Sequence, residues 1–338
     1  MSSVRTAEIA SAPSPDLRAG DWIEVRSAEE ILATLDDKGN LDALPFMPEM
    51  LAFCGRRFRV SKSAHKTCDT ISTYRNRRMT SAVHLEDLRC DGSAHDGCQA
   101  ACLLFWKEAW LKPVGGPSGE SPAKARTHAA PRPDGAGCTV ATLTRVVRVE
   151  PDSSESTDLN YSCQATELVR ATAPLKWWDP RQYVKDLVSR NVGLWDFIRF
   201  GALGTIKAIS RLHWRLGWFF EIRGSAGPKT PTEQLNLKPG EHVQVRSKKE
   251  ILRTIDVEAK NRGLSFDVEM LPFCGRTLRV LARVEKIIND KNGKMIRMPN
   301  ACIILEGATC GGCRSRRRMF CPRAIYPYWR EIWLKRVE

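Results

Sequence analysis

Short runs of alternating polar and apolar residues dominate both ends of the chain. The segment DWIEVR at 21–26 alternates as a half-buried strand does, and RRFRV at 56–60 follows a glycine as a second strand. AVHLEDL at 82–88 and LLFWKEAWL at 103–111 supply two more strands. Because short strands separated by turns are typical of small closed barrels, the pattern predicts an α+β fold that is mainly β.

One short helix interrupts these strands. In SAEEILATLDD, Ser27 is placed to cap the helix and Glu30 stands three residues later, which is the spacing of a capping box. Ile31, Leu32 and Leu35 share one helical face. The pattern therefore predicts one amphipathic helix that packs on the barrel.

The chain repeats this pattern. Residues 20–60 align without a gap on residues 240–280, and 20 of the 41 positions are identical. The alignment continues to Trp106 and Trp329 after three extra residues in the second copy. A match of this length indicates a duplication.

The repeat sets the expected domain organisation. GD, a later Val and EMLAFCGRRFRV resemble SH3-like small barrels, which implies a fold and no activity. A Pro-, Gly-, Ser- and Ala-rich stretch reads as a linker. We expect a disordered tail at 1–16, barrel repeats at 17–114 and 237–338, a flexible linker at 115–137, and a helical module at 138–228.

The helical module carries an amphipathic segment at 194–220. Its apolar residues lie mostly opposite four cations, and it ends in two tryptophans and two phenylalanines. Such a helix packs on the protein's own core, binds a partner protein, or lies on an anionic membrane surface. The four cations argue against a spanning helix, and the N-terminus has no apolar signal segment. We therefore expect a cytoplasmic protein, with the inner membrane periphery as an alternative.

Twelve cysteines suggest metal binding, because disulfides are rare in a reducing compartment. Three cysteines align in each repeat, and the loop between the last two supplies a histidine in one copy and a cysteine in the other. The sequence thus predicts two zinc sites, with an iron–sulfur cluster as the less favoured cofactor. The predicted ligands are Cys54, Cys90, His95 and Cys98 in the first repeat, and Cys274, Cys310, Cys313 and Cys321 in the second.

Alternative ligand sets remain open. Cys54 and Cys274 each stand between Phe and Gly at a strand start, where a small buried thiol would also fit. The fourth ligands would then be Cys102 in the first repeat and Cys302 in the second.

The second repeat has a basic loop, CRSRRRMFCPR. A metal-bound loop with several guanidinium groups would bind an acidic protein or another polyanion, whereas the alternative is a solvated charged loop. The net charge of +14 favours acidic partners in general. The predicted anion-binding residues are Arg314, Arg316, Arg317, Arg318 and Arg323.

Three functions follow from these features. RCDGSAHDGCQ, PLKWWDPRQYV and FCGRRFRV together resemble an uncharacterised bacterial cysteine-rich family encoded near biosynthetic genes, which implies context and no activity. The leading hypothesis is a non-catalytic zinc-containing binding or scaffold protein for an acidic ligand. The alternatives are a metal-dependent biosynthetic enzyme with an open site at Cys90, His95 and Cys98, and a nucleic-acid-binding protein.

Overall fold

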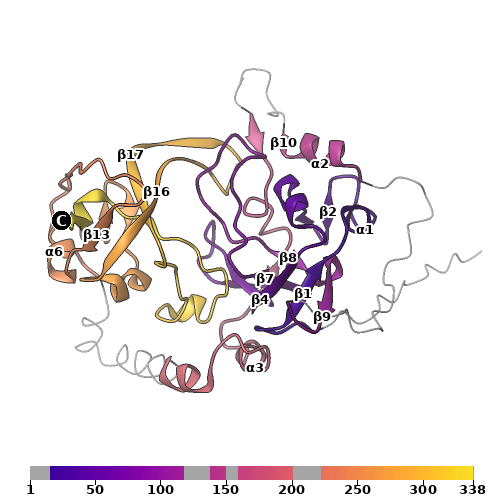
Figure 1. Ribbon diagram of the computed structural model, residues 1–338. Helices are drawn as coiled ribbons and strands as arrows, with labels where there is room; N and C mark the ends of the chain where they lie inside the picture. The colour runs from indigo at the N-terminus through magenta and orange to yellow at the C-terminus, as the bar shows by residue number, and fades with distance from the viewer. Residues whose placement is uncertain (1–15, 118–137, 150–158, 201–221, 338) are drawn as a thin grey trace, which may run out of the picture.

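The computed structural model describes residues 16–117, 138–149, 159–200 and 222–337. Within these residues the fold is mixed α/β, with mostly strands arranged in several small sheets (Figure 1). We call residues 17–114 the first repeat and residues 237–338 the second repeat. The two repeats lie side by side, and residues 138–200 pack against the first.

The main sheet of the first repeat has five strands in the order β8-β7-β4-β1-β9. Its strands are β1 (Trp22–Val25), β4 (Arg57–Ser63), β7 (Ala82–Leu85), β8 (Trp106–Lys107) and β9 (Leu111–Val114). The remaining elements are α1 (Ala28–Leu32), β2 (Asn40–Leu41), β3 (Leu44–Pro45), η1 (Pro48–Phe53), β5 (Lys66–Cys68), β6 (Asn76–Arg78) and η2 (Glu108–Trp110).

The second repeat has a four-stranded sheet in the order β17-β16-β13-β18. Its strands are β13 (His242–Val245), β16 (Thr277–Ile288), β17 (Met295–Leu305) and β18 (Leu334–Arg336). The other elements are α6 (Lys248–Leu252), β14 (Lys260–Asn261), β15 (Leu264–Ser265), η4 (Val268–Phe273), η5 (Arg316–Arg318) and η6 (Glu331–Trp333).

The two sheets share their register. Trp22 pairs with Arg59 in the first repeat, and His242 pairs with Arg279 in the second, which is the same pair 220 residues later. The helices start in the same way: Ser27 forms the predicted capping box with Glu30, and its aligned serine does so in α6. The sequence alignment between the repeats is therefore also a structural one for these elements.

Aromatic packing fixes each core. The indole of Trp110 donates to Thr34 Oγ1 at 3.1 Å and packs edge-on against Phe46, with ring centroids 5.1 Å apart. Trp333 repeats this arrangement with its own threonine, at 3.0 Å. Both tryptophans are fully buried, so each anchors its core by a large apolar surface and one satisfied N–H.

The sheets are open, which corrects the prediction of closed barrels. Among the described strands, β8 and β9 at the two edges of the first sheet do not pair with each other. β8 has two residues, and β9 contains Pro113, which has no N–H to donate to another strand. A short edge strand and a proline edge explain why the ring does not close.

The described residues between 138 and 188 form two helices and three short strands, and helical residues begin again at Leu194. The elements up to residue 188 are α2 (Val140–Val146), β10 (Arg148–Val149), β11 (Asn160–Tyr161), β12 (Ala173–Pro174) and α3 (Arg181–Val188). Leu143, Val147 and Leu168 are buried in the same cluster as the apolar core of the first repeat. This segment thus shares its core with the first repeat.

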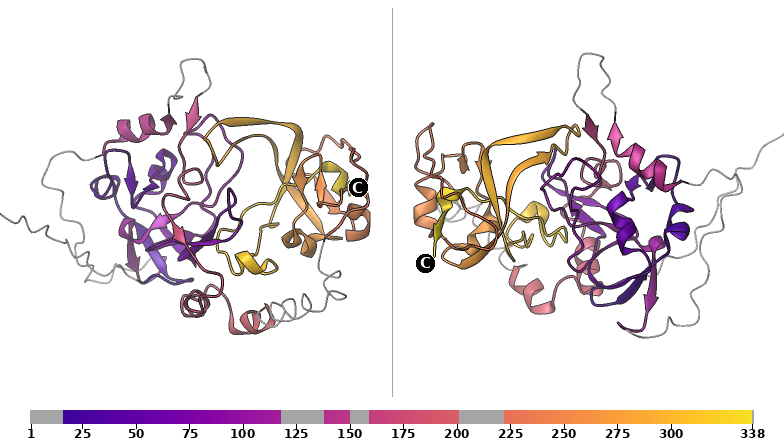
Figure 2. Two further views of the ribbon diagram at one scale, coloured as in Figure 1. Left: turned by 180° about the vertical axis from the view of Figure 1, so that it is seen from behind. Right: turned by 45° about the horizontal axis from the view of Figure 1, so that its top comes forward.

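Each repeat extends an arm to the other. The first arm, residues 64–79, carries β5 and β6, and the second arm, residues 285–297, is the far end of the long β16–β17 hairpin (Figure 2). Cys68 N–H donates to Cys321 Sγ at 3.2 Å, and Ile288 N–H donates to Cys98 Sγ at 3.3 Å. Positions 68 and 288 also differ by 220, so the two contacts are equivalent.

Candidate metal centre

A carboxylate, a thiol and an imidazole meet in the first repeat. Glu49 lies on η1, and Cys90 and His95 lie on the first cysteine loop, residues 90–98. One ligand atom of each side chain lies within 4.8 Å of the other two, and Cys90 Sγ is 3.4 Å from His95 Nε2. Oxygen, nitrogen and sulfur of these kinds are the ligands of zinc in proteins.

A tight turn shapes the first cysteine loop. Gly92 has a φ of +77°, and a Cβ there would lie 2.6 Å from the backbone nitrogen of Cys98. The carbonyl of Gly92 accepts the N–H groups of His95 and Gly97 at 3.1 and 2.8 Å. Only glycine accommodates this close approach of the two backbone segments. The turn at Gly92 therefore brings Cys98 back beside the start of the loop.

The polar atoms of the three-residue group need a partner. Both carboxylate oxygens of Glu49 and Nδ1 of His95 are buried and have no geometrically acceptable hydrogen bond. Burial raises the pKa of the Glu49 carboxyl and lowers the pKa of the His95 imidazole. Burial and the neighbouring carboxylate raise the pKa of the Cys90 thiol. A cation between Cys90 Sγ and His95 Nε2 would give the Glu49 carboxylate a partner, so the donor set fits a divalent metal.

A small cavity adjoins the group. Its lining includes Cys98, Cys102, Cys163 and Asp290, and it encloses about 30 Å³. That volume holds about two water molecules. Ile288 of the second arm forms part of its wall.

Cys54 does not belong to this group. It ends η1, packs against the core of the first repeat, and has a pKa raised by burial. Glu49 lies beside Cys90 instead, and the sequence analysis did not name it. The signal that could have identified it is its identity with Glu269 at the aligned position of the second repeat. Cys102, the alternative ligand, lies on the cavity wall.

Glu269 has a different role from its counterpart Glu49. Its carboxylate accepts the backbone N–H groups of Cys313, Arg314 and Ser315 at 3.3, 2.6 and 2.8 Å. It therefore fixes the second cysteine loop, residues 310–321, through the backbone. Within the described ranges, the group at Glu49 is the one that brings three ligand atoms within 4.8 Å of one another.

The predicted ligands of the second repeat are partly brought together. Cys310, Cys313 and Cys321 lie on the second cysteine loop, where Cys321 meets Cys68 of the first arm. Cys274 ends η4 and packs against the core of its own repeat. The alternative ligand Cys302 is buried in a separate small cluster and accepts a hydrogen bond from Arg330 at 3.4 Å.

Two arginines of the basic loop make contacts within the protein. Arg318 forms an ion pair with Asp267 at 2.6 Å. Arg323 is 4% exposed and donates to the carbonyl of Cys68 at 3.2 Å. Arg314 and Arg317 are exposed, and Arg316 lies on η5 between them. Because Arg323 is buried, it is not available to an external anion, which corrects its assignment as an anion-binding residue.

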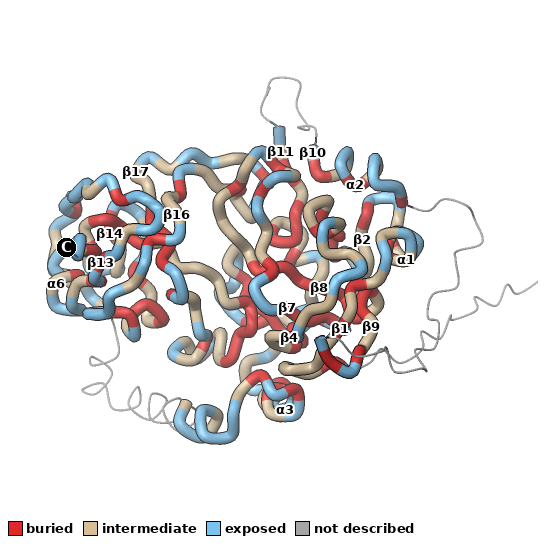
Figure 3. The backbone as a smooth tube through the Cα atoms, viewed as in Figure 1, coloured by how far each residue is buried: buried red, intermediate tan, exposed pale blue. Residues whose placement is uncertain are grey.

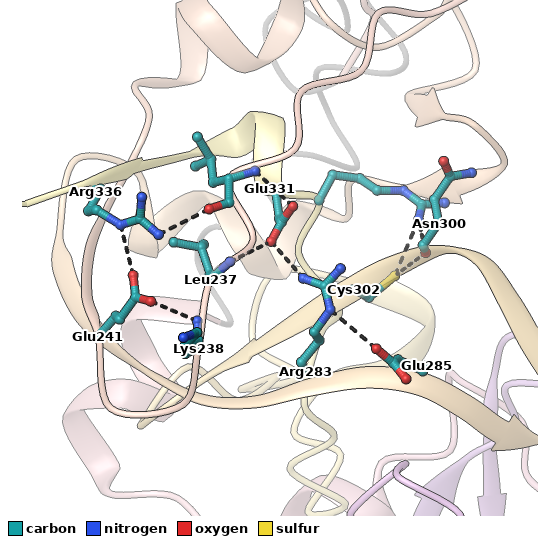
Figure 4. Close-up of polar contacts among 11 residues, drawn as sticks. Leu237, Lys238, Glu241, Arg283, Glu285, Asn300, Cys302, Glu331 and Arg336 are labelled. Carbon is teal, nitrogen blue, oxygen red and sulfur yellow. Dashed lines mark hydrogen bonds and ion pairs between the residues drawn. The ribbon is translucent and has the colours of Figure 1, made fainter.

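A second polar network lies behind the sheet of the second repeat (Figure 4). The Glu331 carboxylate, 5% exposed, accepts the N–H of Leu237 at 2.9 Å and pairs with Arg283 at 2.8 Å. Arg330 donates to the carbonyl of Asn300 at 2.7 Å. These side chains satisfy one another, so the network joins the start of the repeat to its last strands.

An apolar and basic surface surrounds α3 and the helical residues that start at Leu194. We call it the α3 face, and much of it is exposed (Figure 3). Its exposed apolar residues are Trp178, Val184, Val188, Leu194, Trp195 and Ile198. Its exposed cations are Lys176, Arg181, Lys185, Arg190 and Arg199.

The predicted helix at 194–220 is described as far as residue 200, and its remainder lies outside the described residues. Phe197 stacks on Phe320 of the second cysteine loop, with ring centroids 5.6 Å apart. In the part of the chain that the structure covers, the helices are too short or too polar to cross a bilayer.

Comparisons with known proteins add no relative. The chain matches no protein-family model, no curated protein and no solved structure.

Proposed function

We propose that this protein is a non-catalytic, zinc-containing binding protein that recognises an anionic surface. Glu49, Cys90 and His95 would hold the zinc, with Cys98 as the fourth ligand. The carrying observation is that this donor group, with His95 buried and Glu49 and Cys90 half-buried, adjoins a cavity of about 30 Å³. A zinc site with four protein ligands has no open position for a substrate, so its role is structural.

The duplicated SH3-like fold belongs to the same proposal. The shared strand register, capping boxes and tryptophan contacts of the two repeats support it. Each repeat would be an opened version of the small barrel, closed on one side by the arm of its neighbour.

The α3 face is the binding surface in this proposal. Its cations would approach anionic lipid headgroups, and Trp178 and Trp195 would lie at the interface, where amphipathic rings are favoured. Leu194 and Ile198 favour lipid over nucleic acid, because aliphatic side chains do not stack on bases as aromatic rings do. The protein would then be cytoplasmic and peripheral to the inner membrane.

Vesicle flotation tests the ligand. We expect the full chain to float with vesicles containing anionic phosphatidylglycerol and to remain behind with neutral phosphatidylcholine vesicles, with binding that weakens as salt rises. Trp195→Ser should reduce flotation strongly. The matched control is Val257→Ser, because Val257 is 71% exposed on the second repeat, away from this face. Retention on RNA without vesicle binding would favour the nucleic-acid alternative.

One observation favours the enzyme alternative. Three ligand atoms group closely, which is the ligand count of catalytic zinc sites. In this form of the enzyme alternative, Glu49 takes the place of Cys98 in the open site predicted from the sequence. Cys98→Ser then separates the two proposals. If the site is structural, the variant loses the fourth ligand and its zinc affinity should fall sharply. If the site is an open three-ligand site, the variant should keep its metal.

A further inference from the structure

The second cysteine loop gains a thiol from the other repeat. Cys68 lies on β5 of the first arm, 253 positions from Cys321 along the chain, yet its N–H donates to Cys321 Sγ at 3.2 Å. The equivalent position on the second arm is Ile288, which brings only its backbone N–H to Cys98. The two contacts have the same backbone geometry. They differ in the side chain that each arm brings: a thiol at position 68 and an isoleucine at position 288.

We propose that Cys68, Cys310, Cys313 and Cys321 bind a second zinc ion, which joins the two repeats. This extends the metal content proposed above but rests on different residues. No three of these described thiols lie within 4.8 Å of one another, so the ion would draw them together. Cys68 replaces Cys274, which ends η4 and packs in the core of the second repeat.

The loop backbone has the form of a metal-binding turn. Cys310 and Cys313 flank two glycines, and Gly312 has a φ of +64°. A Cβ on Gly312 would lie 2.7 Å from the backbone nitrogen of Cys321. Phe320 N–H donates to the carbonyl of Gly312 at 2.8 Å. The turn is thus held tightly against the segment that carries the fourth thiol.

The surroundings suit the negative charge of four thiolates around one divalent ion. Arg323 is buried and donates to the carbonyl of Cys68 at 3.2 Å. The pKa of Arg318 is raised by Asp267, with smaller effects from Cys310 and Cys68. Sulfur that accepts a backbone N–H, as Cys321 does, is typical of the second shell around a metal thiolate.

The arginines of the basic loop were predicted to bind an external anion, and the proposed thiolate cluster gives some of them a second role. Two of the five contact the backbone of the cluster: Arg323 donates to the carbonyl of Cys68 at 3.2 Å, and the carbonyl of Arg318 accepts the N–H of Cys321 at 3.0 Å. Lys66 of the first arm is buried over the Phe320 ring of the second cysteine loop and pairs with Asp186 at 2.5 Å. A buried cation needs anionic partners, and thiolates would add to the one that Arg323 has in Asp290 at 3.9 Å.

Zinc content of the purified full chain, measured by native mass spectrometry, tests the proposal. We expect about two zinc ions per chain for the wild type and for Cys274→Ser, and about one for Cys68→Ser and for Cys90→Ser. Loss of one ion in Cys274→Ser with retention in Cys68→Ser would overturn the Cys68 site. Loss in Cys90→Ser alone, or in Cys68→Ser alone, would identify which of the two metal proposals fails.

A second measurement applies if Cys68→Ser does not fold. Alkylation of the wild-type thiols before and after chelation, read out by peptide mass spectrometry, should expose Cys68, Cys310, Cys313 and Cys321 only after the chelator is added. Cys302 is the matched control, because it is fully buried in a separate small cluster. Equal alkylation of Cys310 and Cys313 with and without chelator, or a Cys68–Cys321 disulfide, would overturn the proposal.

Discussion

The two cysteine loops use the same backbone frame for different donor sets. In the first repeat, Glu49 is buried without a hydrogen bond beside Cys90 and His95. In the second repeat, the Glu269 carboxylate accepts hydrogen bonds from three backbone N–H groups. The comparison teaches that an identical residue in aligned repeats can lack a hydrogen bond in one copy and support a loop in the other when its neighbours change.

The largest expected effect is loss of the first metal. Cys90→Ser removes a ligand of the proposed site and leaves the Glu49 carboxylate and His95 buried without compensation. We expect the free energy of unfolding to fall by about 5 kcal/mol, because tight metal binding to the folded state contributes on this scale. Chemical denaturation in a zinc-buffered solution measures it. Cys54→Ser is the control, and an equal loss there would place the effect on core packing.

Buried and exposed lysines offer the next contrast. Lys66 is fully buried and pairs with Asp186 at 2.5 Å, whereas its aligned residue Lys286 pairs with the exposed Asp96 at 3.5 Å. Asp186→Asn should destabilise the protein by about 3–5 kcal/mol, since it leaves a buried charge without its partner. Asp96→Asn should cost under about 1 kcal/mol. Similar losses in denaturation midpoints would contradict the contrast.

Acid should destabilise the first repeat through protonation of His84. Burial lowers the pKa of His84 from 6.5 to about 4, and its aligned position in the second repeat is Ile304. Below pH 6.5 the His84 imidazole binds a proton in the unfolded chain but stays neutral in the folded chain. The free energy of unfolding therefore decreases as pH falls toward 4. The loss should reach about 3 kcal/mol by pH 4.

His84→Ile tests the acid effect. It copies the second repeat at this position, so it should flatten the pH dependence of the unfolding free energy between pH 6.5 and 4. The Nδ1–H of His84 donates to the carbonyl of Leu104 at 2.9 Å, and the variant therefore loses one hydrogen bond at neutral pH. An unchanged acid slope would show that another group carries it.

The smallest effect is expected on the basic loop. Arg317 is exposed, so Arg317→Ser should change the free energy of unfolding by less than about 0.5 kcal/mol. Arg323→Ser should destabilise the protein by several-fold more, because Arg323 is buried against Cys68, Thr70 and Asp290. Thermal unfolding curves of the two variants compare them directly. Equal shifts would mean that both arginines are solvated.

Local patterns predicted local structure well. The capping box at Ser27, the strand DWIEVR and the proximity of Cys90 to His95 all depend on residues close in sequence, and all three are observed. Glu49 was missed because a carboxylate on a short 3₁₀ helix carries no spacing signal, while Cys54 nearby did. The contact of Cys68 with Cys321 depends on how the two repeats pack, and no periodicity in either repeat encodes that packing.

The exchanged arms have a consequence for folding order. The contacts between Cys98 and Ile288 and between Cys68 and Cys321 join residues separated by 190 and 253 positions. During synthesis the first cysteine loop leaves the ribosome long before the strand that covers it. Contacts of such sequence separation form late, because loop closure must come first. The nascent first repeat would therefore present its thiols to solvent until the second repeat is complete.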